Sequence, residues 1–393
     1  MRPPRFLMLH REDIRDRRTW SGIPFKMYEA LRARGAEVVL CDRLGYPRSA
    51  RLAIENRLLR WGGHTPFYRR RTAQHYADLV AERLRPLAGS WDVLLAVDSI
   101  VEVALLDIDR PLVIVSDATN TLLMETSYPG YDGFSARAQR SISALERAAY
   151  LRAALVVFSS SWAAAAAVQH HAIPAERIEV VPFGANIDHV PPRQAACQAG
   201  PWSHPELCEL LFLGVDWERK RGWLALETLR ELNRMGVPSR LTVCGNAPAL
   251  PADPQLEVVP FLDKNKPAEL ARLEELLARS SYLLLPSRSE CSPIVFCEAS
   301  AYGLPVVSCD VGGISQIIEH GRTGFLLSRD APASAFAAQI AAGFRDQEAY
   351  RRMRGESRDR YDSLLNWDHW AGRLIQLAGR LGSGAEQRSN ALG

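Results

Sequence analysis

The sequence lacks several features that would assign it to a common class of protein. Its seven cysteines include no Cys-x-x-Cys pair, which argues against a zinc site or a disulfide framework and for a reducing compartment. No run of about eighteen apolar residues occurs, and the apolar stretch near the start is too short for a signal peptide. We therefore expect a cytoplasmic protein that does not span a membrane.

Two nucleotide-binding fingerprints and a strong charge imbalance are also missing. Without Gly-x-Gly-x-x-Gly or a Walker A motif, the chain lacks the usual mark of a Rossmann dehydrogenase or a P-loop nucleotide hydrolase. The net charge of +3 is too small to indicate nucleic acid as a partner. With 47% hydrophobic and 24% charged residues, the composition is that of an ordinary globular protein.

What the sequence does contain is a series of short apolar runs that alternate with helical patterns. The runs are RFLML, AEVVL, DVLLAV, PLVIVS, LVVFS and IEVVPF in the first half, and LLFLG, RLTVCG, LEVVPF, SYLLLP and PVVS in the second. This alternation is typical of parallel sheets with crossover helices. It predicts the α/β class, with two doubly wound, Rossmann-like domains facing a central cleft.

A stretch rich in Pro, Gly and Ala, without periodicity, separates the two halves. It sets the predicted domain boundaries. These are an N-terminal domain at 1–190, a linker at 191–205, a C-terminal domain at 206–365, a helix at 366–381 that crosses back to the N-terminal domain, and a disordered tail at 382–393.

Two glutamates, Glu290 and Glu298, lie in SECSPIVFCEASAYGLPVVS, a stretch that is otherwise small or apolar. Because an isolated buried carboxylate is costly, each of them needs a partner. The stretch predicts a helix between two strands, with Ser292 as the N-cap and Pro293 as the first helical residue. Glu290 then precedes the helix, and Glu298 lies within it.

The predicted start of this helix is a candidate anion site. The backbone N–H groups of Ile294 and Val295 have no acceptor within the helix, and the helix dipole places positive potential there. The layout therefore predicts a phosphate-type site between two carboxylate acceptors.

The two glutamates, with seven residues between them, resemble the Glu-x7-Glu signature of retaining glycosyltransferases of family 4, which have the GT-B fold. Four other segments resemble family segments in the expected order: RTWSGIPFKMYEALRARGAEV, SDATN, VVPFGANID and LFLGVDWERKRGW. The resemblance covers nearly the whole chain.

This resemblance implies transfer of a sugar from a nucleotide-diphosphate sugar, with retention at the anomeric carbon and without a metal ion or other cofactor. Glu290 would contact the donor sugar near the reacting centre, and Glu298 would hold the ribose hydroxyls. The alternative is that both are ordinary charges, in a surface loop and at the polar edge of a core helix. The implied partners are the nucleotide sugar and an acceptor glycan, glycolipid or small molecule.

The chain departs from the common family pattern directly after the first glutamate. Where many members have Gly-Phe-Gly-Leu, it has Cys-Ser-Pro-Ile. Pro293 cannot donate an N–H, so sugar contact is expected from Cys291 or Ser292, and phosphate contact from Ile294 and Val295.

The loop GVDWERKRGW contains the cations expected to neutralise the leaving diphosphate. Lys220 is the main candidate, with a solvated basic turn as the alternative. The arginine that family members often carry after the glycine is replaced by Val215, and either Arg219 or Arg221 is expected to substitute for it.

Three further candidates lie in the first half. Gly22, in TWSGIP, allows a ligand to approach the backbone before a predicted helix, unless Ser21 merely caps that helix. Asp117 occupies the position where many relatives have a histidine near the acceptor and the donor sugar, and the alternative is an N-cap of the following helix. His10 ends the first strand and is the third candidate.

The segment PFLDKNKPAEL resembles the family segment beside the nucleotide base. Backbone groups of Phe261 and Leu262 are expected to meet the base edge, and Lys264 the ribose or the acceptor. The glycines of GGIS, at 312–315, predict a tight turn that backbone geometry alone explains equally well.

Residues 51–71 contain six arginines against one glutamate, interleaved with three aromatic residues. Such a surface suits peripheral contact with the inner face of an anionic membrane. The alternative is an ordinary solvated helix and loop.

The sequence thus predicts a metal-independent glycosyltransferase in which Glu290→Gln or Lys220→Ala abolishes transfer and leaves the fold intact. Reaction by front-face substitution in cell-surface glycan, glycolipid or secondary-metabolite biosynthesis is expected from the resemblance. Two alternatives remain, a nucleotide-sugar epimerase or hydrolase on the same fold and a catalytically silent nucleotide-sugar-binding protein.

Overall fold

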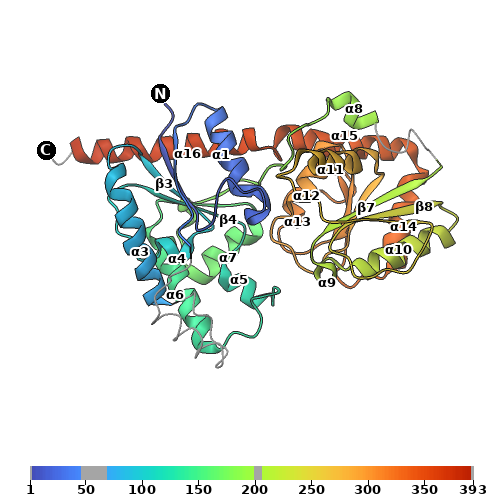
Figure 1. The fold of residues 1–393 in the computed structure, drawn as a ribbon, viewed down its shortest axis with the longest axis horizontal. Helices are drawn as coiled ribbons and strands as arrows, with labels where there is room; N and C mark the ends of the chain where they lie inside the picture. The colour runs from blue at the N-terminus through green and yellow to red at the C-terminus, as the bar shows by residue number, and fades with distance from the viewer. Residues whose placement is uncertain (1, 46–68, 199–205, 391–393) are drawn as a thin grey trace. The chain divides into compact units, whose positions relative to one another are not determined.

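The computed structural model describes residues 2–45, 69–198 and 206–390. The chain forms two compact units, one made of Met1–Val181 and Trp370–Gly393, the other of Pro182–His369. Each unit contains a six-stranded sheet (Figure 1). The predicted α/β class is confirmed.

The first unit is built on a sheet with the order β2-β1-β3-β4-β5-β6, in which every neighbouring pair is parallel. Its strands are β1 (Phe6–Leu9), β2 (Val38–Cys41), β3 (Val93–Val97), β4 (Leu112–Ser116), β5 (Leu155–Phe158) and β6 (Ile178–Val180). Strands β3 and β4 are buried along their whole length, as their continuous apolar sequences predict for a sheet covered on both faces.

Helices connect these strands and cover the sheet (Figure 1). They are α1 (Ile23–Ala33), α3 (Arg70–Leu84), α4 (Ile100–Val103), α5 (Asn120–Glu125), α6 (Ala136–Arg152) and α7 (Ser161–His171). The long α16 (Trp367–Asn390) joins this unit from Trp370 onward. Its buried Trp370, Leu374 and Leu377 form an apolar stripe along the helix, and Arg373 forms an ion pair of 3.0 Å with Glu179 of β6.

The second unit has a sheet of order β12-β11-β10-β7-β8-β9, again parallel throughout. Its strands are β7 (Cys208–Gly214), β8 (Ser239–Gly245), β9 (Leu256–Val259), β10 (Tyr282–Leu285), β11 (Val306–Cys309) and β12 (Gly324–Leu327). The register aligns β7 and β8 residue by residue, so both strands end together on a glycine. All these strands therefore present their carboxyl ends at one edge.

The helices of the second unit are α8 (Arg193–Gln198), α9 (Trp217–Lys220), α10 (Gly222–Arg234), α11 (Pro267–Arg279), α12 (Ile294–Ala301), α13 (Ile314–Ile317), α14 (Ala333–Arg345) and α15 (Gln347–Ser363). In Figure 1, α10 and α14 lie on one face of the sheet, and α11 and α12 lie on the other. This is the doubly wound arrangement that the alternating sequence pattern predicts.

Strand β12, with the sequence GFLL, was not among the predicted strands. It begins with glycine, contains no β-branched residue and is only half-buried along most of its length. Its sequence therefore lacks the β-branched residues that are typical of strands, and it is not buried continuously as the predicted strands are.

The limits of the two units differ from the boundaries expected from the sequence. The division falls between Val181 and Pro182, and α8 lies within the expected linker. Arg354 of α15 donates a hydrogen bond of 2.5 Å to the carbonyl oxygen of Ala196, which ties α8 to the second unit. The backbone of α16 is helical to Asn390, through most of the tail that was expected to lack order.

The structure bears on one of the two sequence-based expectations about membranes, and the other concerns residues that it mostly does not describe. In the ranges that the structure describes, no helix is both long and apolar enough to cross a bilayer. Most of the basic, aromatic stretch at 51–71 lies outside the described residues, which resume at Arg69.

Candidate functional site

The second unit places the predicted side chains in the loops and helices that follow the carboxyl ends of its strands. Lys220 ends α9, which follows β7, Lys264 follows β9, and Glu290 follows β10. Open parallel sheets bind ligands outside this edge. It is therefore the candidate site of the second unit.

Three charged side chains form the centre of this edge, and we call them the Arg219–Lys220–Glu290 cluster. The Nζ of Lys220 contacts Oε1 of Glu290, and Nη1 of Arg219 lies 3.0 Å from Oε2. Lys220 is 7% exposed and Glu290 5%. The partner that a buried Glu290 requires is thus a pair of cations.

The two cations determine the protonation of Glu290. Burial raises the pKa of its carboxyl, but the charges of Lys220 and Arg219 outweigh burial and hold the pKa below the ordinary value of a glutamate. Burial lowers the pKa of the Lys220 ammonium, and Arg219 lowers it further, while Glu290 acts in the opposite direction. Glu290 is therefore an ionised hydrogen-bond acceptor at neutral pH.

Of the two arginines left open by the sequence, Arg219 lies in the cluster and Arg221 does not. Arg219 also donates to the carbonyl oxygen of Ser289 at 2.9 Å, which holds its guanidinium beside the Glu290 loop. The guanidinium of Arg221 instead donates to the carbonyl oxygen of Arg329 at 2.5 Å. Val215, where the family arginine is expected, is 53% exposed.

The helix after Glu290 begins one residue later than predicted. Pro293, with ψ of 101°, is the N-cap of α12, so the prediction of Ser292 as N-cap is wrong. The extended backbone of the proline delays the first helical residue to Ile294, which is followed by Val295. Ser292 is buried beside this start, and the two N–H groups belong to the helix terminus as predicted.

Glu298 finds its partner in Lys264, which follows β9. The Nζ of Lys264 contacts Oε1 of Glu298, whose side chain is 2% exposed. In the same loop Leu262 is half-buried, while Phe261 presents an exposed ring. The structure thus brings Lys264 to Glu298, a contact that sequence reasoning missed because the two residues are 34 positions apart.

A second missed contact joins Gly312 to the backbone of Glu290. Gly312 has φ of +60°, and a Cβ atom built on it would lie 1.7 Å from the carbonyl oxygen of Glu290. Only glycine permits this approach. The turn at 312–315 is therefore required by the packing of the Glu290 loop as well as by its own backbone.

In the first unit, the turn before α1 has an unusual backbone. Trp20, Ser21 and Gly22 have φ values of 41°, 58° and 84°, all in the left-handed region. Gly22 is the N-cap of α1, so the alternative that Ser21 caps the helix is wrong. Two non-glycine residues held in this region mark a strained turn, and such strain concentrates at ligand sites.

Asp117 and His10 lie at the carboxyl ends of β4 and β1. Asp117 is half-buried and is not the N-cap of α5, because Thr119 occupies that position and its hydroxyl accepts from the N–H of Leu122 at 3.1 Å. His10 is buried, and its Nδ1 lies 2.8 Å from the carbonyl oxygen of Val97.

The start of α5, directly after the loop that carries Asp117, is anchored by Glu146 of α6. The buried carboxylate accepts from the N–H groups of Asn120 and Thr121 at 2.5 and 2.9 Å, and from the Thr121 hydroxyl at 2.7 Å. Nε2 of His171 lies 3.2 Å from it. The sequence offered no signal for this anchor, since Glu146 lies in an ordinary amphipathic helix.

Replacing Glu146 with glutamine is expected to lower the free energy of unfolding by about 1–3 kcal/mol. The amide keeps one acceptor but turns an NH₂ group toward donors, so at least one N–H of the half-buried Asn120 and Thr121 loses its partner. Urea unfolding followed by circular dichroism measures the change. Glu176→Gln, at an exposed position of the same unit, is the control, and an equal effect in both variants would show that the anchor is not needed.

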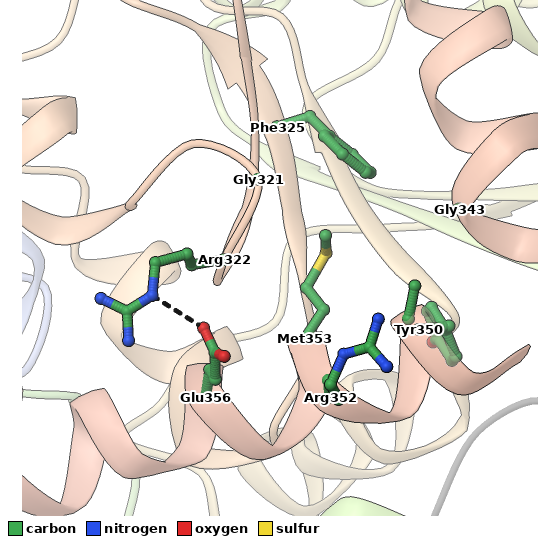
Figure 2. A pocket seen from close by; sticks show the side chains of 9 residues that line it. Gly321, Arg322, Phe325, Gly343, Tyr350, Arg352, Met353 and Glu356 are labelled. Carbon is green, nitrogen blue, oxygen red and sulfur yellow. Dashed lines mark hydrogen bonds and ion pairs between the residues drawn. The ribbon is translucent and has the colours of Figure 1, made fainter. Parts of the chain in front are cut away.

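A separate pocket of about 180 Å³ lies at the amino end of β12 and contains none of the predicted site residues (Figure 2). Phe325 and Met353 form its apolar part, and an ion pair of 3.0 Å between Arg322 and Glu356 lies at its side. Because ligands of open parallel sheets bind at the carboxyl ends, this pocket is distinct from the candidate site.

Two family models match the chain. Residues 25–184 match the glycosyl transferase 4-like domain, and residues 208–346 match the glycosyl transferases group 1. A D-inositol 3-phosphate glycosyltransferase of Pseudarthrobacter chlorophenolicus is 30% identical over 187 residues, which are 44% of either protein. A putative colanic acid biosynthesis glycosyltransferase, WcaL of Escherichia coli, is 28% identical over 48% of this chain and 47% of its own.

Solved structures resemble the chain over nearly its whole length. Sucrose-phosphate synthase of Thermosynechococcus elongatus has a TM-score of 0.67 at 17% identity, covering 98% of this chain and 100% of its own. HepE of Anabaena, in complex with UDP and glucose, has a TM-score of 0.62 at 15% identity, covering 96% and 99%. At this identity the likeness shows the fold, which is GT-B.

The matched segments span half or less of the curated relatives, between 22% and 50% of their length. The two family models nevertheless cover most of both units in the order expected from the sequence. On these matches and on its GT-B fold, the chain belongs to the group 1 glycosyltransferases, family 4.

Proposed function

We propose that the protein is a retaining glycosyltransferase that moves a sugar from a nucleotide-diphosphate sugar to an acceptor hydroxyl. The observation that carries the proposal is the Arg219–Lys220–Glu290 cluster beside the start of α12. Two cations and the helix N-terminus favour a diphosphate, and an ionised carboxylate next to them favours sugar hydroxyls.

In the proposed reaction the bond between the anomeric carbon and the diphosphate oxygen breaks as the acceptor oxygen bonds to the same face of that carbon. The acceptor proton passes to the departing diphosphate, so no protein nucleophile is needed. Lys220, Arg219 and the N–H groups of Ile294 and Val295 stabilise the charge that grows on the leaving group. Enzymes lower barriers by roughly 8–23 kcal/mol, and positioning with leaving-group electrostatics must supply most of this amount.

Donor recognition is proposed to involve the loops around this cluster. Glu298, which pairs with Lys264, accepts hydrogen bonds from the ribose hydroxyls, and backbone groups at Phe261 and Leu262 lie beside the base. Ser292 or Cys291 contacts the sugar. In the first unit, Gly22 borders the donor phosphates, and Asp117 lies near the acceptor and the donor sugar.

A screen for binding and turnover tests this function. Thermal unfolding is measured with uridine, guanosine, thymidine and adenosine diphosphates, since a ligand at 100 times its dissociation constant stabilises by about 2.7 kcal/mol. The matching nucleotide sugar is then incubated with candidate acceptors. Binding without turnover would favour the silent binding protein, and release of free or isomerised sugar would favour the hydrolase or epimerase.

The pH dependence of turnover gives a prediction about Lys220. Its protonated form is the one that stabilises the diphosphate, and its pKa in the free protein is lowered by burial and by Arg219. As pH rises through this lowered pKa, the ammonium loses its proton, and kcat/KM is expected to fall about tenfold per pH unit. The fall should begin at a lower pH than that at which a free lysine titrates. Initial rates across the alkaline range measure it.

Lys220→Arg is the control for this pH profile, because a guanidinium stays charged throughout the accessible range. The alkaline limb should disappear from the profile of this variant, whatever its absolute rate. If the limb keeps the same midpoint in Lys220→Arg, another group causes it.

A further inference from the structure

A pocket of about 250 Å³ in the second unit is lined by three arginines and one aspartate. Arg221 precedes α10, Arg288 follows β10, and Arg329 and Asp330 follow β12. All four residues lie in loops at the carboxyl edge of the sheet. The lining thus carries three positive charges and one negative charge.

Among the described residues, no carboxylate lies within ion-pair distance of these three arginines. In the part of the chain that the structure describes, Arg221, Arg288 and Arg329 form no ion pair, whereas Arg219 close by in the chain pairs with Glu290. Sγ of Cys309 lies 3.8 Å from Nη1 of Arg221, but burial raises the pKa of this thiol, which is therefore neutral. The pocket keeps an excess of positive charge.

The backbone of Arg221 adds an independent observation. Its φ of 56° and ψ of 51° lie in the left-handed region, which disfavours any residue with a Cβ and favours glycine. The fold nevertheless holds an arginine here, and its guanidinium donates a hydrogen bond to the carbonyl oxygen of Arg329, which also lines the pocket. Non-glycine residues held in this conformation concentrate at ligand sites.

The pocket adjoins the Arg219–Lys220–Glu290 cluster but uses other side chains. The N–H of Arg288 donates to the carbonyl oxygen of Arg219 at 2.8 Å, so the two loops are joined. Arg219 and Glu290 contribute to the cluster, while Arg221 and Arg288 line the pocket. Its volume is below the roughly 300–1,000 Å³ of pockets for drug-sized ligands, so a small anionic group fits better than a whole nucleotide sugar.

We infer that this pocket binds a phosphate-class anion, at a site separate from the one proposed for the donor diphosphate. Guanidinium groups bind phosphate oxygens through paired, charge-assisted hydrogen bonds, and three of them around one space can surround a tetrahedral anion. The anion is either free phosphate or the phosphoryl group of a sugar phosphate. This site goes beyond the proposed transfer reaction.

Phosphate titration of the full chain tests the inference. Thermal unfolding and calorimetry are followed with inorganic phosphate, at ionic strength held constant with chloride, with and without a saturating nucleoside diphosphate. Phosphate is expected to raise the unfolding temperature in both conditions. A parallel titration with a hexose 6-phosphate separates the sources, since tighter binding than inorganic phosphate assigns the pocket to a sugar phosphate and equal binding to the free anion.

Two variants locate the bound phosphate. Arg221→Gly removes the guanidinium and suits the left-handed backbone, and Arg288→Gln removes an exposed side chain, so both are expected to fold. Each should weaken phosphate binding by about tenfold or more, the value of one lost charge-assisted hydrogen bond. Arg240→Gln, at an exposed position of β8, removes the same charge and should change nothing.

Three results would overturn the inference. They are absence of phosphate binding by the wild type, an equal loss in Arg240→Gln, and complete competition by the nucleoside diphosphate, which would place the phosphate in the donor site. The proposed function fails by a different result, the absence of diphosphate binding, so the two failures are distinguishable.

Discussion

Replacing Lys220 with methionine is expected to lower kcat for sugar transfer by roughly 10²–10³-fold and the free energy of unfolding by about 3 kcal/mol. The first effect follows because the leaving diphosphate loses its ammonium partner. The second follows because Lys220 and Glu290 form a buried pair, and removal of one member leaves the other with less compensation. Release of nucleoside diphosphate from the donor and urea unfolding measure the two effects.

This expectation changes the one drawn from sequence alone, in which such variants leave the fold intact. Because the pair is buried, a loss of stability accompanies the loss of turnover in either single variant. The double variant Lys220→Met/Glu290→Gln separates the effects, since removing both charges should recover part of the stability and none of the turnover.

The control for Lys220→Met is Lys266→Met, which removes the same charge from an exposed ion pair with Glu269. Solvent screens this pair, so neither unfolding nor turnover should change noticeably. Wild-type turnover in both Lys220→Met and Glu290→Gln would contradict the proposed function.

Replacing Gly312 with alanine is expected to lower kcat/KM by about 10²-fold or more, although Gly312 carries no chemical group. The added Cβ would lie 1.7 Å from the carbonyl oxygen of Glu290, so either the turn or the Glu290 loop must shift. A shift of the Glu290 backbone misplaces its carboxylate relative to Lys220 and to the donor sugar. Steady-state kinetics with varied donor measure the loss.

Gly236→Ala is the matched control for this prediction. Gly236 also has a left-handed backbone, with φ of +73°, but an added Cβ there meets no atom within 4 Å. It carries the same conformational cost, about 1–2 kcal/mol, without the collision. If both variants lose turnover equally, strain in general and not displacement of Glu290 is responsible.

Much of the fold could be predicted because its signals are local. Of the twelve strands in the described ranges, eleven coincide with apolar runs, since a buried strand of a parallel sheet needs a continuous apolar sequence. The end of α12 was also predictable, as Gly303, which follows the C-cap residue Tyr302, takes φ of +56°. The exact start was not, because Ser292 has the right chemistry for an N-cap but the extended backbone of Pro293 intervenes.

By itself the sequence determined the α/β class and the alternation of strands and helices. It also determined that Glu290 and Glu298 need partners, because any buried carboxylate is costly unless it is paired. Only the tertiary structure decided that Lys220 and Lys264 are among those partners and that Arg219, not Arg221, joins the cluster. The reason is distance along the chain: Lys220 and Glu290 are 70 residues apart, and no local pattern encodes which loops meet at the edge of a sheet.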